Sequence, residues 1–337
     1  MSEIRMALVG CGGMAKSHAA VMEKLQGKLS IVAAVDIDLQ KAEAMAAALG
    51  IGRVATDYRE VLPDVDAVFL VLPHHLHHPV AMDCLAAGKH VLLEKPMANS
   101  EKECLELIEA QKKARKVLMI AYCMRFHPLV VRLKELLDKK AYGDVFQVSI
   151  WTEQLTIYPP GHWASSAKTL GGGQLFSHGC HYIDLLLWFL GRPLSGTHVG
   201  TNCGTPWMEK EGTSNVTIEF EGGKLGYHFG TWGARGTRLG YSIHAHCTEG
   251  MLEANFRAGK LIAIVKGEEQ VLYEAERGKY TNFEMEHFVE CITEGKEPLT
   301  DGPGSLQGLR VIWKLYEAEQ NHTVADLRGL GLDEFQG

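Results

Sequence analysis

The sequence predicts an α/β fold in which a doubly wound parallel sheet is followed by an α+β domain with a large, mostly antiparallel open sheet. Up to about residue 122, short apolar runs alternate with helical patterns, as in parallel strands joined by crossover helices. The first run ends in the glycine-rich turn Gly10-Cys11-Gly12-Gly13-Met14-Ala15, directly before a helical pattern. From residue 196 to 275, β runs follow one another with turns between them, which favours antiparallel pairing.

In the first part of the chain, strands are expected over 4–9, 30–36, 67–72, 90–94 and 117–122. Asp38 is a typical N-cap for the helical pattern that follows it, and Gly50 ends that pattern. Pro79 is expected to open another helix, and Ser100 with Glu103 forms a capping box before a third. These alternating elements predict a Rossmann domain over residues 1–122.

The second part, residues 123–337, has helical patterns over 128–140, 178–190, 281–294 and 303–320. Residues 215–220 alternate apolar and polar side chains, as a strand with one solvated face does. The last two helices are compatible with packing on the antiparallel sheet or back on the first domain. The chain length of 337 residues also favours two domains.

Composition excludes several classes of function. The net charge of −7 and the lack of a Lys/Arg block argue against binding to nucleic acid or to an anionic membrane. No apolar stretch approaches the roughly 20 residues that span a bilayer. The eight cysteines include no C-x-x-C pair and the N-terminus has no signal-peptide pattern, so we expect reduced thiols in a cytoplasmic protein.

The glycine-rich turn predicts a dinucleotide site because it lies between an expected strand and an expected helix. Gly10 permits the tight turn, Gly12 lets the backbone approach a pyrophosphate, and Ala15 still allows the helix to pack closely on the strand. The backbone N–H groups at the start of the helix, at Gly13 and Met14, are expected to face the phosphates.

Asp36 favours NAD as the dinucleotide. A carboxylate about 20 residues past the glycine turn accepts hydrogen bonds from the adenosine ribose, and Asp36-Ile37 stands there, after the second expected strand. A 2′-phosphate would meet negative charge with no Arg or Lys nearby in the sequence, so NADP is the less favoured cofactor. The alternative is that Asp36 only ends a strand and Asp38 only caps a helix. We assign the cap to Asp38 and the ribose to Asp36.

A second motif, Glu94-Lys95-Pro96, follows the apolar run Val91-Leu92-Leu93. Open α/β sheets bind ligands at the carboxyl ends of their strands. A lysine there, close to a nicotinamide, can polarise a substrate hydroxyl or carbonyl. Taken alone, however, the three residues also suit an exposed turn.

Together these motifs resemble the Gfo/Idh/MocA family of sugar and polyol oxidoreductases, and the resemblance covers nearly the whole chain. The most specific segment is Ala87-Gly88-Lys89-His90-Val91-Leu92-Leu93-Glu94-Lys95-Pro96. Supporting segments are Leu72-Pro73-His74-His75-Leu76-His77, Tyr122-Cys123-Met124-Arg125-Phe126-His127-Pro128, Gly171-Gly172-Gly173 leading to His181 and Asp184, and Thr248-Glu249-Gly250. The family fold is a Rossmann domain followed by an α/β domain whose open sheet often makes oligomer contacts.

The resemblance implies roles for individual residues. Lys95 contacts the nicotinamide ribose and the substrate, and His181 is the catalytic acid/base. The other cofactor contacts that we expect are Pro73, His74, His77, Glu94 and Arg125, with His77 facing the nicotinamide. Asp184, three residues after His181 in a helical pattern, is placed to orient it.

The chain departs from the family pattern at Ser177. An acidic residue is common four positions before the histidine, and a serine cannot hold the negative charge that raises the pKa of a neighbouring imidazole. His178 is a second expected polar contact to the substrate. Tyr158 and Trp163 are candidates for its aromatic wall, with packing of their own loop as an equal alternative.

Three functions remain compatible with the sequence, and the first is preferred. It is an NAD-dependent oxidoreductase acting on a secondary alcohol or ketone of a sugar, polyol or glycoside, with His181 moving the proton and Lys95 stabilising the alkoxide. The alternatives are a glycosidase that oxidises its sugar transiently with NAD, and a non-catalytic dinucleotide-binding regulator. A metal site at His74, His75, His77 and His78 is disfavoured because no Cys or acid follows at ligand spacing. A homodimer or homotetramer through the C-terminal sheet is expected.

Overall fold

The computed structural model describes residues 3–22, 25, 27–276, 278 and 280–332, so the outer ends of both predicted domains, 1–2 and 333–337, lie outside it. The chain forms two compact units. The first unit is Met1–Cys123 with Tyr280–Ser305, and the second is Met124–Lys279 with Leu306–Gly337. Residues 280–305 therefore belong to the first unit, so the second is not the uninterrupted segment 123–337 that the sequence predicts.

The first unit contains a six-stranded sheet in which every pair of neighbouring strands is parallel. Its strand order, β3-β2-β1-β4-β5-β6, is that of a doubly wound Rossmann fold. The strands are β1 (Ile4–Val9), β2 (Leu29–Val35), β3 (Arg53–Ala55), β4 (Ala67–Leu70), β5 (His90–Leu93) and β6 (Leu118–Ile120). The prediction missed β3, whose three residues are too few to show a pattern.

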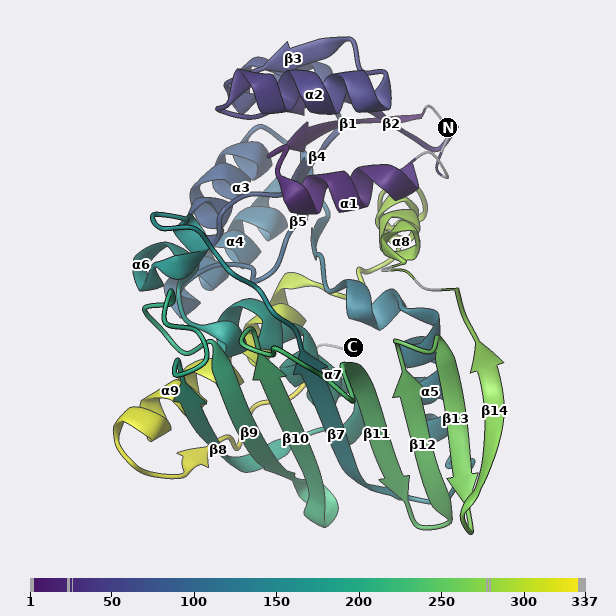
Figure 1. The fold of residues 1–337 in the computed structure, drawn as a ribbon. Coiled ribbons are helices and arrows are strands. Elements are labelled where there is room, and N and C mark those ends of the chain that lie inside the picture. The colour runs from purple at the N-terminus through teal and green to yellow at the C-terminus, as the bar shows by residue number, and fades with distance from the viewer. Residues whose placement is uncertain (1–2, 23–24, 26, 277, 279, 333–337) are drawn as a thin grey trace. The chain divides into compact units, whose positions relative to one another are not determined.

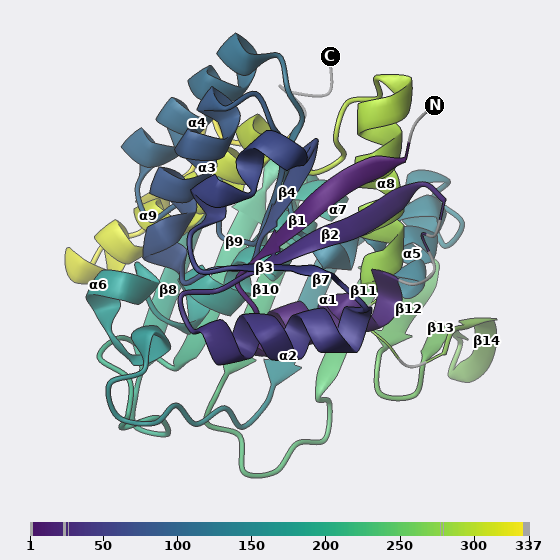
Figure 2. The same cartoon turned by 90° about the horizontal axis from the view of Figure 1, so that it is seen from above.

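Helices cover both faces of this sheet, with α1 and α2 on one side and α3 and α4 on the other (Figure 2). They are α1 (Gly13–Met22), α2 (Leu39–Leu49), α3 (His77–Ala86) and α4 (Glu101–Ala114), and α8 (Thr281–Glu294) packs on α1. Asp38 caps α2 by accepting from Gln40 N, and Gly50 ends α2 with a positive φ of 66°.

Two predicted helix starts need correction. The α3 helix begins at His77, so Pro79 lies within its first turn, where a missing N–H costs no helical bond. Ser100 caps α4 as expected, but the Glu103 carboxylate accepts from Asn99 N, at 3.1 Å, one residue earlier than in a capping box.

The second unit is built on a nine-stranded sheet, ordered β14-β13-β12-β11-β7-β10-β9-β8-β15 (Figure 1). The strands are β7 (Val145–Glu153), β8 (Pro193–Thr201), β9 (Thr213–Phe220), β10 (Lys224–Thr231), β11 (Tyr241–Cys247), β12 (Gly250–Asn255), β13 (Lys260–Val265), β14 (Glu268–Glu274) and β15 (Ala325–Asp326). All pairs are antiparallel except β7 with β10. The prediction missed β7, the central strand, although Val148 and Ile150 are buried in the core.

Helices cover one face of this sheet: α5 (Pro128–Asp138) packs on β12–β14 and α7 (Cys180–Leu190) on β7 and β10. A π-helical turn, Leu175–Gly179, leads into α7. The short helix α6 (Ala167–Leu170) and the long helix α9 (Gly302–Gln320) complete the set. No helix among the described residues is long and apolar enough to cross a membrane.

Candidate active site

The glycine-rich turn after β1 needs a glycine for the fold at its first position only. Gly10 has φ +95°, and a Cβ added there would lie 2.1 Å from the carbonyl oxygen of Val71. A Cβ added at Gly12 or Gly13 would meet nothing within 4 Å. The space in front of these two glycines is therefore open, as a turn that receives a pyrophosphate requires. Ala15 is buried against the sheet and Met14 is 40% exposed.

Asp36 ties the end of β2 to this turn. Its Oδ2 accepts a hydrogen bond from Cys11 N (2.8 Å), and its Oδ1 accepts one from Asp38 N (2.9 Å). A carboxylate oxygen can accept more than one hydrogen bond, so both oxygens retain capacity for ribose hydroxyls. Burial, and to a smaller extent the charge of Asp36, raise the pKa of the Cys11 thiol to about 11, so Cys11 adds no negative charge beside Asp36. The adjacent Ile37 is 93% exposed.

His77 has a different role from the one predicted. Its ring is fully buried. Nδ1 lies 2.7 Å from the carbonyl oxygen of Pro96, and Nε2 lies 2.9 Å from that of Leu72. Burial lowers the pKa of His77, although both carbonyl contacts oppose this shift. The imidazole thus links the loop after β4, which begins with Pro73 and the buried His74, to the loop after β5, and both of its nitrogens are engaged by these two carbonyl oxygens.

The carboxylate of Glu94 likewise points into the protein. Its Oε1 lies 2.7 Å from Nε2 of the buried His18 on α1, and its Oε2 accepts from Lys95 N at 3.2 Å. Burial raises the pKa of Glu94, but the hydrogen bond and charge of His18 outweigh it and the net shift is downward. The Glu94 carboxylate is therefore engaged within the first unit, and the predicted contact of Glu94 with the cofactor stays a prediction. Lys95 is partly exposed at the end of β5 and precedes Pro96 through a cis peptide bond.

In the second unit, Asp184 pairs with Arg125 and does not orient His181 as predicted. Arg125 Nε and Nη2 donate to the two Asp184 oxygens at 2.7 and 2.9 Å, and both side chains are buried. The guanidinium also lies 4.9 Å from the ring centroid of Trp188. The i, i+3 spacing of His181 and Asp184 was compatible with a contact, but a bidentate guanidinium uses both carboxylate oxygens. The predicted contact of Arg125 with the cofactor stays a prediction.

His181 lies in the first turn of α7, and His178 lies in the π-helical turn before it, among neutral polar side chains. The two rings lie 6.2 Å apart. His178 Nδ1 is 3.3 Å from Gln174 Nε2, and its Nε2 is 3.4 Å from the Tyr241 hydroxyl, which donates to Gln154 Oε1. Tyr241 and Gln154 escape prediction because only β11 and the end of β7 bring them here, whereas Gln174 is the N-cap residue of the same π-helical turn and stands four residues before His178. Ser177, in the π-helical turn, is buried.

The aromatic loop of residues 158–163, which precedes Gly171-Gly172-Gly173, packs on its own side chains and on a small core. Tyr158 stacks on His162, with ring centroids 4.8 Å apart, and meets the edge of Trp232 at 5.7 Å. Tyr158, Trp163 and Trp207 flank a small core of Ala164, Leu170, Met208 and Trp232. This geometry favours the loop-packing alternative for Tyr158 and Trp163 over a substrate wall.

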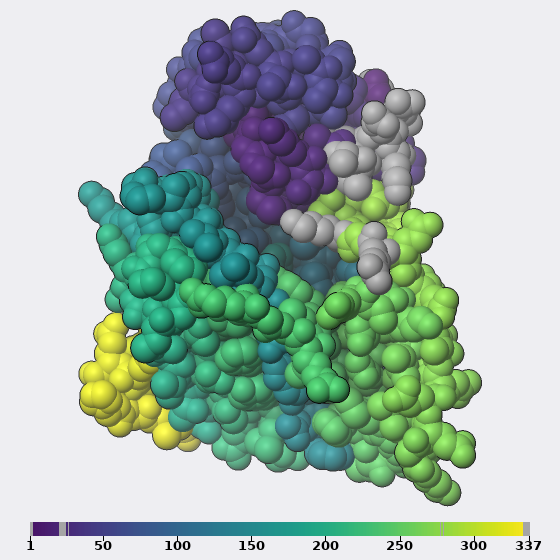
Figure 3. Space-filling model, viewed as in Figure 1, coloured from purple at the N-terminus to yellow at the C-terminus, as the bar shows by residue number. Residues whose placement is uncertain are grey.

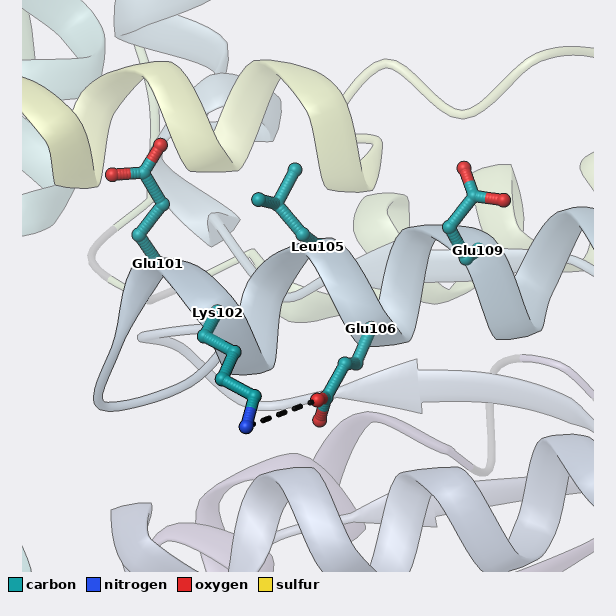
Figure 4. Close-up of a pocket in the computed structure, with 5 residues that line it drawn as sticks. All are labelled: Glu101, Lys102, Leu105, Glu106 and Glu109. Atoms are coloured by element: carbon teal, nitrogen blue, oxygen red, sulfur yellow. Dashed lines mark ion pairs between the residues drawn. The ribbon is translucent and has the colours of Figure 1, made fainter.

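Two other features lack the chemistry of a site. Among the described residues no cluster of three or more His, Cys, Asp or Glu side chains is arranged to hold a metal ion. The groove in Figure 4 is lined only by side chains of α4, namely Glu101, Lys102, Leu105, Glu106 and Glu109. Lys102 pairs with Glu106 at 3.8 Å there, and none of the predicted site residues lines it.

Comparison with known proteins identifies the family. Residues 4–122 match the oxidoreductase family with an NAD-binding Rossmann fold, and residues 130–253 match the C-terminal domain of the same family. The chain belongs to the Gfo/Idh/MocA oxidoreductase family. Its first unit is accordingly an NAD-binding domain, as the glycine turn and Asp36 predict.

Family members with known names show the range of likeness. Trans-1,2-dihydrobenzene-1,2-diol dehydrogenase of Xenopus laevis is 30% identical over 79% of this chain and 82% of its own length. Inositol 2-dehydrogenase 4 of Saccharopolyspora erythraea is 31% identical, but the match spans only 58% of this chain and 57% of that relative. A levoglucosan dehydrogenase in complex with NADH and levoglucosan superposes with a TM-score of 0.88 over 97% of this chain and 100% of that one. At 20% identity, this last likeness concerns the fold.

The residues of this Gfo/Idh/MocA member fit NAD. The open space before Gly12 and Gly13 suits a pyrophosphate, and the fixed Asp36 carboxylate suits ribose hydroxyls. Pro73 and Lys95 follow β4 and β5; β4 lies next to β1 in the strand order, and β5 lies next to β4. Three neighbouring strands thus present motif residues at one edge of the sheet, where doubly wound folds bind ligands.

Proposed function

We propose that this protein transfers hydride between NAD and a secondary alcohol or ketone of a neutral sugar, polyol or related polyhydroxylated compound. The observation that carries the proposal is that the open glycine turn, Asp36 and Lys95 follow the carboxyl ends of β1, β2 and β5, at the same edge of one parallel sheet. When bound, NAD supplies the hydride acceptor or donor. The protein supplies placement and proton transfer.

In the proposed reaction, His181 takes the proton from the substrate hydroxyl as general base. Lys95 donates a hydrogen bond to the oxygen as it becomes an alkoxide, which stabilises the charge that develops there. Because Ser177 is neutral, we propose that His181 works without an adjacent carboxylate at that position. The reverse reaction uses the same two groups.

The proposed substrate class follows from the surroundings of His178. Tyr241, Gln154 and Gln174 are neutral side chains that both donate and accept hydrogen bonds. Substrate hydroxyl groups have the same dual character. A neutral polyhydroxylated compound therefore suits these side chains better than an anionic one.

The test is to incubate the purified protein with NAD and a panel of polyols, free sugars and glycosides, following NADH absorbance and aglycone release together. Net NADH formation supports the proposal. Aglycone release without net NADH would identify a redox glycosidase, and tight NAD binding with no turnover on the panel would favour a regulator. Lys95→Met and His181→Ala should each lower kcat by about 100- to 10,000-fold while NAD affinity changes little.

Matched controls are the exposed residues Lys41 and His322. Lys41→Met and His322→Ala should leave kcat unchanged. Full turnover in Lys95→Met or His181→Ala would overturn the assignment of that residue.

We propose that the open face of the nine-stranded sheet forms a homodimer or homotetramer. Its middle strands present aromatic side chains there, with Trp151 4.8 Å from His244 and 5.9 Å from Tyr227 between ring centroids. Phe146 and Leu225 are 47% and 46% exposed. No helix among the described residues of this unit covers the face, which is turned to the viewer in Figures 1 and 3. Exposed apolar area of this kind marks protein interfaces.

Light scattering after size exclusion measures this assembly. The wild-type protein should elute as a dimer or tetramer, and Leu225→Glu should shift it toward the monomer because it buries a charge in the interface. Leu105→Glu is the matched control, because Leu105 is 44% exposed on α4, outside the nine-stranded sheet. A monomeric wild-type protein at micromolar concentration would contradict the proposal.

A further inference from the structure

The helix that contains His178 and His181 begins against two side chains that are remote in sequence. Its first four N–H groups, at residues 173–176, have no carbonyl partner within the helix. The Tyr316 hydroxyl accepts from the first and the last of them, both at 3.2 Å. Glu211 accepts from the two between, through its carbonyl oxygen at 2.7 Å and its Oε1 at 3.3 Å. The Tyr316 hydroxyl in turn donates to Glu211 Oε1 at 2.5 Å.

Glycines make room for this capping pair. A Cβ on Gly173 would lie 2.2 Å from Glu211 Oε2, and a Cβ on Gly200 would lie 2.7 Å from Glu211 Cγ. A Cβ on Gly172 would lie 2.5 Å from Cβ of Phe176. Gly173 therefore has a structural reason in this chain, since the lack of a side chain there lets the Glu211 carboxylate reach the start of the helix.

The charged and titratable groups near Glu211 lie on α9 and β8. Glu319, one turn after Tyr316 on α9, accepts from Gly200 N at 2.7 Å and lies 2.7 Å from His198 Nδ1. The His198 ring stands edge-on to Tyr316 at 5.2 Å between centroids. Burial raises the pKa of Glu211 to about 7, with a smaller contribution from the charge of Glu319 and opposition from the Tyr316 hydrogen bond.

We infer that Glu211 and Tyr316 are positioning residues for the reaction, because they fix the start of the helix from which His178 and His181 project. The inference rests on the proposed function, in which His181 moves the proton. Small displacements of a catalytic group are costly, and a misplacement of about 1 Å can lower turnover about 100-fold. Three of these four N–H groups are held by the side chains of Glu211 and Tyr316 and the fourth by the backbone carbonyl of Glu211, which restricts such displacement.

The ionisation of Glu211 should change the strength of this cap. A carboxylate is a stronger acceptor than a carboxylic acid, and negative charge is favoured at a helix N-terminus. Proton uptake by Glu211 thus weakens the bonds from Tyr316 and Leu175 N. Turnover should therefore depend on pH near neutrality through Glu211, in addition to any dependence through His181.

The test compares Glu211→Gln, Glu211→Ala and Tyr316→Phe in the full-length protein. Each should lower kcat by about 10- to 100-fold with an NAD dissociation constant within about 2-fold of wild type. Glu211→Gln retains an acceptor oxygen, so it should lose less activity than Glu211→Ala and should lack the inflection of kcat near pH 7. Glu209→Gln is the matched control, because Glu209 also caps a helix by accepting from Ala167 N at 2.7 Å.

A measurement on the wild-type protein tests the inference even if the variants fail to fold. Hydrogen exchange of the peptide covering residues 173–178, corrected for the intrinsic effect of pH, should show more protection at pH 8 than at pH 6. Equal protection at pH 6 and pH 8 would overturn the inference. It would also be overturned if Glu211→Gln and Tyr316→Phe fold and show the same turnover and pH profile as Glu209→Gln. If His181→Ala keeps full turnover, the proposed function itself fails. Loss in His181→Ala with no effect of Glu211→Gln overturns only the positioning role.

Discussion

Gly10 and Gly12 are two residues apart, but a side chain at Gly10 would clash with the backbone whereas a side chain at Gly12 would enter open space. Gly10→Ala would place a methyl group 2.1 Å from a carbonyl oxygen at a φ of +95°, so we expect a loss of at least about 1–3 kcal/mol in unfolding free energy. Gly12→Ala meets nothing within 4 Å, so stability should stay constant or rise by up to about 1 kcal/mol while NAD affinity falls. Urea unfolding and NAD titration separate the two effects. Equal destabilisation by both substitutions would contradict this account.

Glu284 on α8 is a buried carboxyl group near Glu94. Burial and the charge of Glu94 raise its pKa well above the ordinary value of 4.5, so it favours the protonated form in the folded protein. Its stabilising contribution is complete below about pH 4.5 and is lost as the pH rises through the folded-state pKa. Glu284→Gln should therefore reduce the decline in unfolding free energy between pH 5 and pH 8, measured by urea unfolding.

The control for Glu284 is Glu294→Gln at the exposed end of the same helix, which should keep the wild-type slope. If Glu284→Gln also keeps that slope, the pKa of Glu284 in the folded state is not raised above its value in the unfolded chain.

At the scale of elements, the Arg125–Asp184 pair joins the turn before α5 to α7. Asp184→Asn leaves a buried guanidinium without its bidentate partner, so we expect a loss of about 3–5 kcal/mol. The exposed pair Arg132–Glu135 provides the comparison, and Glu135→Gln should cost at most about 1 kcal/mol. Chemical denaturation measures both. A loss in Asp184→Asn as small as that in Glu135→Gln would show that the pair does not hold the two elements together.

At the scale of the whole molecule, the first unit is built from two separate segments of the chain, because residues 280–305 pack with residues 1–123. Ile120 N donates to Thr300 O at 2.9 Å, and Met285 and Phe288 of α8 are buried. A fragment of residues 1–123 exposes the surface that α8 covers, so it should not unfold cooperatively. Joining residues 280–305 to it through a flexible linker should restore a cooperative thermal transition and NAD binding. A fragment 1–123 that melts and binds NAD like the joined protein would contradict this expectation.

Much of the first unit could be predicted from the sequence because its signals are local. The apolar runs of β1, β2, β4, β5 and β6, the caps at Asp38 and Ser100, and the Gly10 turn each depend on residues within one or two turns of chain. The family match confirms the NAD-binding domain that these signals predict. The roles of Lys95 and His181 stay predictions, because they depend on the motif resemblance.

The sequence by itself determined the α/β class, the glycine turn and the preference for NAD, because neighbouring residues specify helix caps, strands and turns. Only the tertiary structure decided which side chains meet across long separations. It paired Asp184 with Arg125, turned His77 and Glu94 inward, placed β7 at the centre of the second sheet and brought Glu211 and Tyr316 to the start of the His181 helix. A carboxylate or imidazole has many possible partners in a sequence of this length, and the path of the backbone alone selects among them.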